Sequence, residues 1–204
     1  MYKTPQEDFW AGSFGNDYID RNKEAKIISS NIALFSRILS RTLNVKSVIE
    51  FGSNIGLNLI AIKRLIPESE LSAIEINEKA CAALRDMKFA KVYAQSILNF
   101  KPDYQRDLVF TKGVLIHINP DSLPDVYRII YETSSKYICL AEYYNPSPVE
   151  VKYREHDGRL FKRDFAGELL DKYKDLVLID YGFVYHRDYQ FSLDDITWFL
   201  LEKV

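Results

Sequence analysis

Strand-like and helix-like patterns alternate along most of the chain, and this alternation is the feature that most constrains the fold. Short apolar runs typical of buried strands, the first of them SVIEF, are each followed by a segment whose apolar residues recur at helical spacing. Because parallel strands need long crossover connections, this order is typical of a parallel sheet covered on both faces. We expect helices over residues 22–43, 56–66, 77–87 and 120–135, and strands over 47–51, 70–76, 91–97, 107–113 and 137–144.

The C-terminal part has a different pattern. Residues 175–187 and 194–203 are two strand-like runs with no helical segment between them, so we expect them to pair antiparallel at one edge of the sheet. No repeat, linker-like stretch or low-complexity tract interrupts the 204 residues. The sequence therefore predicts a single α/β domain over residues 1–204, with an N-terminal lid and helix (1–44) before a sheet-containing core (45–204).

Composition narrows the range of partners. The chain has 27 basic and 29 acidic side chains, so it lacks the positive charge typical of proteins that bind nucleic acids or anionic membranes. Cys81 and Cys139 have neither metal-ligand spacing nor a disulfide framework, and we predict no metal site. The sequence shows neither a targeting pattern nor an apolar run of membrane-spanning length. We therefore expect a cytoplasmic protein that acts on small molecules.

The loop after the first strand, FGSNIG, lies where an open parallel sheet binds its ligand. Gly52 permits a tight turn, and Asn54 is the kind of non-glycine residue that best tolerates a left-handed backbone. Gly56 lets the next helix begin close to the ligand and the sheet. A dinucleotide-binding motif would have a glycine where Leu57 stands, and the chain has no Gly-Lys-Ser or Gly-Lys-Thr sequence. Nicotinamide or flavin dinucleotides and nucleoside triphosphates therefore fit this loop poorly.

Two acidic residues flank this loop. Glu50 precedes Gly52, and Glu75 ends the next predicted strand, about 20 residues beyond the loop. Glu75 would accept hydrogen bonds from both hydroxyls of a ribose, and Glu50 would act through water or a backbone network near an ammonium group. S-adenosylmethionine has both features. The alternative interpretation is a structural glycine turn beside surface glutamates.

Longer segments resemble known families. IEFGSNIG together with AIEIN resembles motif I and the following acidic motif of the class I S-adenosylmethionine-dependent methyltransferases, with asparagine in place of the middle glycine. FWAGSFGNDYIDRN, FTKGVLIHINP, EYYNPSPVEVKYR and GRLFKRDFAGE resemble the pseudaminic acid biosynthesis-associated methylase family, and the likeness spans nearly the whole chain. The resemblance implies a Rossmann-like, doubly wound seven-stranded sheet, mostly parallel with an antiparallel C-terminal edge strand. It also implies a small-molecule methyltransferase of the kind often found beside surface-sugar genes.

The resemblance further implies which residues surround the cofactor. Ser96 stands where many relatives have an aspartate against the adenine amino group, and the backbone of Ile97 is the alternative contact. Glu75 and Ile76 would hold the ribose and adenine. The methionine part would lie against Gly52, Ser53, Asn54 and Gly56.

The segment FTKGVLIHINP follows the fourth predicted strand, so we expect Lys112, Gly113 and His117 near the sulfonium. His117 is the leading acid–base candidate, because an imidazole titrates near neutral pH and can take a proton from an acceptor hydroxyl or amine. Tyr144, at the end of the fifth predicted strand, is the second catalytic candidate. Alternatively, His117 caps a turn or only lines the pocket. Methyl transfer itself needs mainly an in-line arrangement of nucleophile, methyl group and sulfur.

The segment VEVKYREHDGRLFKRDF, residues 149–165, is too polar and irregular for a core and is rich in aromatic and cationic residues. Stacking faces combined with cationic donors are typical of a site for a sugar that carries a carboxylate or phosphate. We therefore expect an irregular wall of the substrate site here. The predicted substrate-binding residues are Glu142, Tyr143, Asn145, Tyr153, Arg154, His156 and His186.

The N-terminal segment FWAGSFGNDYIDRN combines aromatic and polar residues without a core period. It is predicted to fold over the cofactor as a lid through Trp10, Phe14, Tyr18, Arg21 and Asn22, with Arg21 clamping the methionine carboxylate. The alternative is that its aromatic side chains only fasten the first helix to the sheet.

The leading hypothesis for function is transfer of a methyl group from S-adenosylmethionine to an oxygen or nitrogen of a small molecule. The acceptor class would be a bacterial nonulosonic or related surface sugar, or its nucleotide-activated form. A second hypothesis is a non-catalytic protein that binds S-adenosylmethionine as a sensor or scaffold. A third keeps the methyltransferase and changes the acceptor to a peptide or protein, against which the balanced net charge argues mildly.

Overall fold

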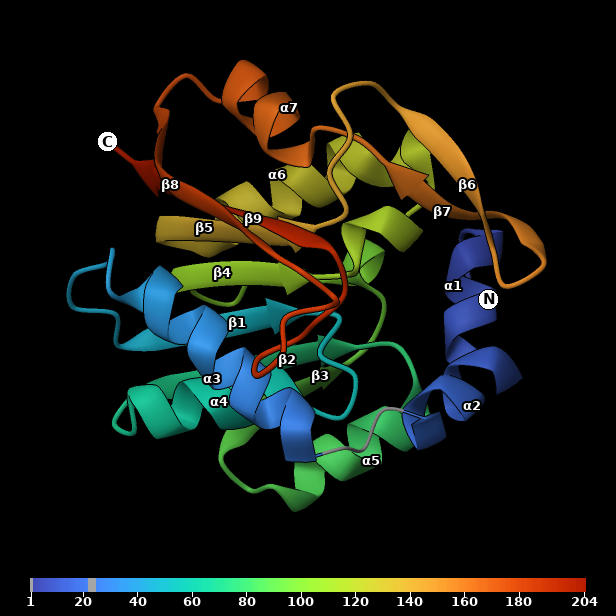
Figure 1. Ribbon diagram of the computed structural model, residues 1–204, viewed down its shortest axis with the longest axis horizontal. Helices are drawn as coiled ribbons and strands as arrows, with labels where there is room; N and C mark the ends of the chain where they lie inside the picture. The colour runs from blue at the N-terminus through green and yellow to red at the C-terminus, as the bar shows by residue number, and fades with distance from the viewer. Residues whose placement is uncertain (1, 22–24) are drawn as a thin grey trace.

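The computed structural model describes residues 2–21 and 25–204 (Figure 1). The strands are β1 (Ser47–Phe51), β2 (Glu70–Glu75), β3 (Ala90–Ala94), β4 (Arg106–Lys112), β5 (Ser134–Glu142), β6 (Val149–Tyr153), β7 (His156–Lys162), β8 (Leu176–Val184) and β9 (Ile196–Lys203). The α-helices are α1 (Pro5–Ala11), α2 (Ser13–Arg21), α3 (Ala25–Leu39), α4 (Leu57–Leu65), α5 (Glu78–Asp86), α6 (Leu123–Thr133) and α7 (Phe165–Lys172). Short 3-10 turns are η1 (Ile97–Asn99), η2 (Leu115–His117) and η3 (Pro120–Ser122). Within the described ranges, no helix combines the length and apolar character that crossing a membrane requires.

The main sheet has seven strands in the order β3-β2-β1-β4-β5-β9-β8. β1 pairs in parallel with β2 and β4, β2 pairs in parallel with β3, and β4 pairs in parallel with β5. β9 runs antiparallel to both of its neighbours, β5 and β8. The predicted doubly wound, mostly parallel α/β fold is confirmed, and the two C-terminal runs pair antiparallel at one end of the sheet as expected.

Apolar residues build one core on each face of this sheet. Val48 of β1 packs in the core formed with α3 and α4, whereas its neighbour Ile49 packs in the core formed with α6 and α7. On the first face, the rings of Phe35 in α3 and Phe110 in β4 meet edge to face with centroids 5.1 Å apart. Because helices cover both faces (Figure 1), the central strands are apolar at consecutive positions. The sheet is thus a rigid platform for whatever lies at its carboxyl end.

The N-terminal segment forms two helices, α1 and α2, on the side of the molecule toward which β1, β2 and β4 point (Figure 1). α1 begins with a capping box, in which the backbone N–H of Glu7 donates to Thr4 Oγ1 (3.2 Å) and the backbone N–H of Thr4 donates to the Glu7 carboxylate (2.8 Å). Pro5 occupies the first helical position, where its missing N–H costs little. The sequence pattern predicted no helix before residue 22.

Residues 149–165 were predicted to be irregular, but the structure shows regular elements there. They form the β6–β7 hairpin and the start of α7. The hairpin turn consists of Arg154 and Glu155, which both have positive φ (45° and 69°). Turns of this kind normally contain asparagine or glycine, so the sequence carried none of the usual hairpin signals. Asp164 then accepts a hydrogen bond from the backbone N–H of Gly167 (2.8 Å) and caps α7.

Candidate functional site

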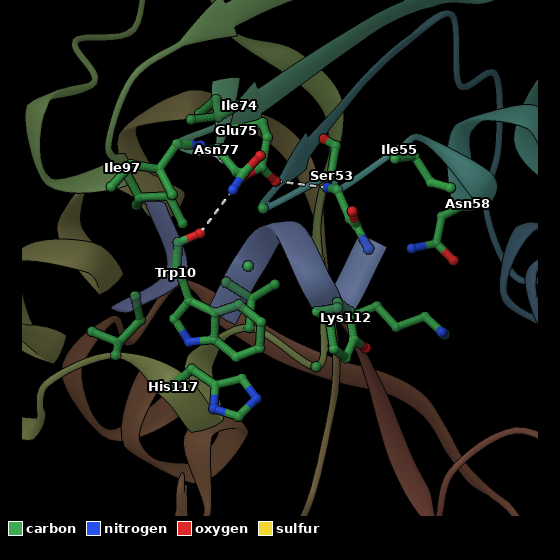
Figure 2. A pocket seen from close by; sticks show the side chains of 18 of the residues that line it. Trp10, Ser53, Ile55, Asn58, Ile74, Glu75, Asn77, Ile97, Lys112 and His117 are labelled. Carbon is green, nitrogen blue, oxygen red and sulfur yellow. Dashed lines mark hydrogen bonds between the residues drawn. The ribbon is translucent and has the colours of Figure 1, made fainter. Parts of the chain in front are cut away.

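A cavity of about 460 Å³ lies above the carboxyl ends of β1, β2 and β4, between these strands and helices α1 and α2 (Figure 2). Its size is typical of sites for small molecules and cofactors. Most of the predicted cofactor residues lie in its wall. The predicted site residues that line the cavity are Trp10, Tyr18, Gly52, Ser53, Asn54, Glu75, Ile76, Ser96, Ile97, Lys112, Gly113, His117 and His186.

The loop between β1 and α4 has the left-handed backbone that its sequence predicts. Gly52, Asn54 and Gly56 have φ values of 75°, 47° and 77°. A Cβ on Gly52 would lie 2.6 Å from a methyl group of Val114, so the position needs glycine for space as well as for φ. Gly56 does not line the cavity, and a Cβ there would meet Leu84 of α5 at 2.8 Å. Gly56 therefore leaves room for the side chain of Leu84 at the start of α4.

Glu75 stands at the end of β2 with its carboxylate in the cavity wall. Oε2 accepts the backbone N–H of Asn54 (2.7 Å), and Oε1 accepts those of Ile76 and Asn77 (2.8 Å each). Burial raises the pKa of this carboxyl above its ordinary value, and the three backbone donors oppose that rise. The side chain thus joins the β1–α4 loop to the β2–α5 loop. Each carboxylate oxygen can accept further hydrogen bonds from a ligand.

Glu50 lies behind the loop and does not line the cavity. Its side chain is fully buried, and Oε1 accepts a hydrogen bond from Asn58 Nδ2 (2.5 Å). Burial raises the pKa of the Glu50 carboxyl to about 8, although the hydrogen bond from Asn58 and the charge of Lys112 lower it. Asn58, which the sequence did not single out, separates Glu50 from the cavity, and Figure 2 shows Asn58 and Lys112 on the same side of the site.

Ser96 lines the cavity, and its hydroxyl is already bonded to helix α1. Its hydroxyl donates to the carboxylate of Glu7 in α1 and accepts the backbone N–H of Leu98 (3.0 Å). Glu7 also lines the cavity, so α1 brings a carboxylate to the place where the sequence offers only a serine. The four residues TPQE at positions 4–7 form a capping-box signature, which was the available signal for this helix.

His117, in η2, is buried beneath Trp10 (Figure 2), with ring centroids 4.6 Å apart. Its Nδ1 lies 2.6 Å from the carbonyl oxygen of Arg159. A carbonyl can only accept, so Nδ1 carries the proton and Nε2 keeps its lone pair. Burial lowers the pKa of the imidazole to about 4, and the bond to Arg159 opposes this less strongly. His117 is therefore neutral at pH 7, and the predicted titration near neutral pH is wrong because it neglected burial.

Several predicted residues lie away from the cavity because the chain turns outward after β5. The ring of Tyr144 is 42% exposed and packs on Phe199, with centroids 5.8 Å apart, so the structure does not bring it to His117. Glu142 is buried and accepts the backbone N–H groups of Val114 (3.0 Å) and Ile116 (3.4 Å). Burial raises the pKa of Glu142 to about 7. Its contacts hold the loop that leads to His117.

Four further predicted substrate residues do not line the cavity. Arg154 is in the hairpin turn, and Asn145 donates through Nδ2 to the carbonyl of Ser147 (2.6 Å). His156 packs against Phe9, with ring centroids 5.0 Å apart. Burial raises the pKa of Tyr143, which interacts with Asp194.

Four predicted residues remain. Tyr153 is 5.0 Å from the His117 ring but outside the lining, whereas His186 lines the cavity beside Asp195 (2.8 Å). The side chain of Arg21 and all of Asn22 lie outside the described part of the structure.

Asparagines that the sequence did not single out complete the wall. Asn77, the residue that caps α5, accepts the N–H of Ala80 (3.1 Å) and donates to the carbonyl of Trp10 (3.2 Å). It thereby ties α1 to the end of β2 (Figure 2). Asn31, in α3, is fully buried and lines the cavity with both amide atoms unpaired. Among the described residues, no group of three or more His, Cys, Asp or Glu side chains is arranged to hold a metal ion.

No protein-family model matches the sequence, and no curated protein is significantly similar to it. Solved structures do share the fold. The 1,6-didemethyltoxoflavin-N1-methyltransferase of Burkholderia thailandensis, solved with S-adenosylhomocysteine, is 15% identical over 98% of this chain and 87% of that chain, with a TM-score of 0.71. The magnesium protoporphyrin IX methyltransferase of Synechocystis PCC 6803 is 13% identical over 97% of each chain, with a TM-score of 0.68.

A plantazolicin methyltransferase, solved with a substrate analogue and S-adenosylhomocysteine, is 13% identical over 97% of this chain and 93% of that chain, with a TM-score of 0.65. The fold is that of the class I S-adenosylmethionine-dependent methyltransferases. At these identities the likeness concerns the methyltransferase fold alone. The predicted resemblance to the pseudaminic acid-associated family is not supported by any of these comparisons.

Proposed function

We propose that this protein transfers the methyl group of S-adenosylmethionine to a hydroxyl or amine of a small molecule. The observation that carries the proposal is the carboxylate of Glu75, held in the cavity wall at the end of β2 and bonded to the left-handed loop after β1. In a doubly wound sheet, an acid at this position accepts hydrogen bonds from ribose hydroxyls. The shared fold of methyltransferases solved with S-adenosylhomocysteine supports the same cofactor.

The residues of the cavity fit each part of this cofactor. Ile76 and Ile97 offer apolar surface for the adenine, and Glu75 offers acceptors for the ribose. The backbone of Gly52 and Ser53 lets a ligand approach β1 closely. When bound, S-adenosylmethionine supplies a methyl group already activated by its sulfonium. The protein therefore has to bind the cofactor and the acceptor, orient them, and remove a proton from the acceptor.

His117 is proposed to receive that proton at Nε2. The carbonyl of Arg159 fixes the tautomer, so the lone pair of Nε2 is the part of the ring left to accept a hydrogen bond. With a pKa of about 4, the imidazole is a weak base toward a neutral hydroxyl. It is still basic enough to take the proton as the acceptor oxygen gains positive charge during methylation, because the oxygen then becomes a strong acid.

The acceptor is proposed to be a small molecule bound in the cavity between the N-terminal helices and the segment that joins β8 to β9. Trp10 and Tyr18 present aromatic faces to the cavity, and Asp194 and His186 present polar groups at its wall. Aromatic faces next to polar groups suit a sugar ring as well as a heteroaromatic ring. The finer proposal of a nonulosonic surface sugar is supported by the sequence resemblance only.

The test is to incubate the protein with methyl-labelled S-adenosylmethionine and a panel of sugars, nucleotide sugars, amines and phenols, and to identify the labelled product by mass. Labelled product that disappears with the His117→Ala variant supports the proposal. Binding of S-adenosylmethionine without transfer to any compound or to added peptides would favour the non-catalytic alternative.

A further inference from the structure

Asn31 has a buried polar side chain without a hydrogen-bond partner, whereas buried polar groups normally have one. Its residue is 0% exposed, it lines the cavity from α3, and neither its amide nitrogen nor its amide oxygen has a hydrogen-bond partner. Leaving a buried polar group unpaired costs about 1–3 kcal/mol, so such groups are few in native proteins and need an explanation. A leucine here would extend the apolar core that α3 forms. The amide therefore indicates a polar ligand in this part of the cavity.

Two more groups with unused hydrogen-bonding capacity line the same cavity. Asn58 in α4, a helix that packs on α3, donates through Nδ2 to Glu50, and its Oδ1 is buried without a donor. Lys112, at the end of β4, feels the charges of Glu50 and Asp194, but within residues 2–21 and 25–204 no carboxylate lies at ion-pair distance from its ammonium group. The cavity lining thus contains both unpaired amide atoms and an ammonium group without an ion-pair partner at contact distance.

We propose that Asn31, Asn58 and Lys112 bind the amino-acid end of S-adenosylmethionine. Lys112 and the amide nitrogen of Asn31 donate to its carboxylate, and the amide oxygens of Asn58 and Asn31 accept from its ammonium group. This inference rests on the proposed function. Two of the three residues, Asn31 and Asn58, were not predicted from the sequence.

The ammonium group of Lys112 and the amide oxygens of Asn31 and Asn58 together favour a zwitterionic ligand over a simple anion. A phosphate or sulfate would use Lys112, but it would leave the oxygens of Asn31 and Asn58 buried without donors. It would also face the negative charge of Asp194, which lines the same cavity. A group with a carboxylate and an ammonium satisfies both kinds of atom at once.

The test compares two ligands that differ only at this end. S-adenosylhomocysteine carries the amino acid, and 5′-methylthioadenosine lacks it. Isothermal titration of each into wild-type protein and Asn31→Leu should show that the variant loses affinity for S-adenosylhomocysteine by about 10- to 150-fold, as expected for charge-assisted hydrogen bonds. Its affinity for 5′-methylthioadenosine should stay unchanged. Lys112→Met should behave in the same way.

Ser30→Ala is the matched control. Ser30 precedes Asn31 in α3, is buried and has an unpaired hydroxyl, but it does not line the cavity. Its substitution should leave both affinities unchanged. Without ligand, Asn31→Leu should melt at the wild-type temperature or above it, because an unpaired buried amide is removed.

Two results would overturn the inference in different ways. Equal loss of affinity for both ligands in Asn31→Leu, or no loss for either, would overturn the assignment of Asn31 while the cofactor stands. Failure of the wild-type protein to bind either nucleoside would overturn the proposed function together with this inference.

Discussion

The two sides of the cavity are built in different ways. On the sheet side, Gly52 and Glu75 sit at the ends of adjacent strands, and one hydrogen bond from the Asn54 backbone to Glu75 joins them. On the lid side, the contacts join residues far apart in the chain. Gln6 donates to the carbonyl of Gly158 (2.9 Å), and His117 bonds the carbonyl of Arg159. The sheet side is therefore encoded locally, whereas the lid side exists only when α1, η2 and β7 are assembled.

This difference has a consequence for function. A cofactor that many related enzymes share can be held by residues on a rigid sheet, and an acceptor that varies can be held by elements added around it. We expect substitutions on the sheet side to change cofactor binding, and substitutions on the lid side to change turnover or acceptor choice.

The largest expected effect is on the lid side. His117→Ala should lower turnover by about 10²–10⁴-fold while cofactor affinity is kept, because the residue removes a proton and does not hold the nucleoside. Steady-state kinetics on the identified acceptor, with titration calorimetry alongside, measure both quantities. His156→Ala is the control, since His156 packs on Phe9 and does not line the cavity. Equal losses in the two variants would remove His117 from the chemistry.

The same variant gives a pH test with a defined sign. Burial lowers the pKa of His117 to about 4, so the imidazole is a proton acceptor throughout the range from pH 5 to pH 9. The wild-type rate should therefore show no titration of this group near pH 6.5, and it should fall only as the pH approaches 4. A rate that drops through pH 6.5 and loses that step in His117→Ala would show that the ring is more exposed during turnover.

On the sheet side, substitutions at two glycines distinguish the cost of backbone strain from the cost of steric crowding. Gly52→Ala and Gly113→Ala each force alanine into a left-handed backbone (φ 75° and 65°), at about 1–2 kcal/mol. Only Gly52→Ala also places a Cβ 2.6 Å from Val114, which adds about 1–3 kcal/mol, whereas the space beside Gly113 is open.

The melting temperature of Gly52→Ala should therefore be well below that of Gly113→Ala. The affinity for S-adenosylhomocysteine should also fall more in Gly52→Ala than in Gly113→Ala. The double variant Gly52→Ala with Val114→Ala should recover part of the unfolding temperature. Identical melting temperatures for the two single variants would mean that the loop moves to accommodate the methyl group.

The smallest expected effect concerns Glu50 behind the loop. Its carboxyl has a pKa of about 8 in the folded protein, raised mainly by burial, against about 4.5 when unfolded. From pH 6.5 to pH 8.5 the unfolded carboxyl is already ionised while the folded one still loses its proton, so stability should fall as pH rises. The effect is at most about 1.4 kcal/mol per pH unit. Glu50→Gln should make the melting temperature fall less steeply with pH than it does in the wild-type protein. Glu142, whose pKa burial raises to about 7, and the unfolded-state His117 titrate in both proteins, so the difference between the two slopes isolates Glu50. A slope unchanged by Glu50→Gln would contradict the protonated carboxyl.

The sequence was sufficient for the sheet and for the loop after β1. Consecutive apolar residues, a glycine at a left-handed turn and an acid at a strand end are local patterns, and each has a fixed structural meaning. The hairpin escaped prediction because Arg154 and Glu155 make a turn that normally needs asparagine or glycine. Asn31 escaped because a polar residue in an amphipathic helix is ordinarily on the exposed face.

Chain direction explains the misplacement of Tyr144. The prediction placed Tyr144 at the site because it follows β5, but the chain leaves the sheet at Glu142 and forms a bridge between Tyr144 and Arg163. Which way a loop turns depends on the elements packed against it, here β7 and α7. No local pattern in the sequence carries that information.

The role of Glu75 as the ribose-binding carboxylate is tested by titrating S-adenosylhomocysteine and NAD into the wild-type protein and into Glu75→Gln. We predict that S-adenosylhomocysteine binds one-to-one, that NAD does not bind, and that Glu75→Gln weakens binding by about 1.5–3 kcal/mol for each charge-assisted hydrogen bond lost to the ribose. The melting temperature of the variant monitors its bonds to the backbone of Asn54 and Asn77. Tight binding of NAD, or unchanged S-adenosylhomocysteine affinity in a folded Glu75→Gln variant, would contradict the account.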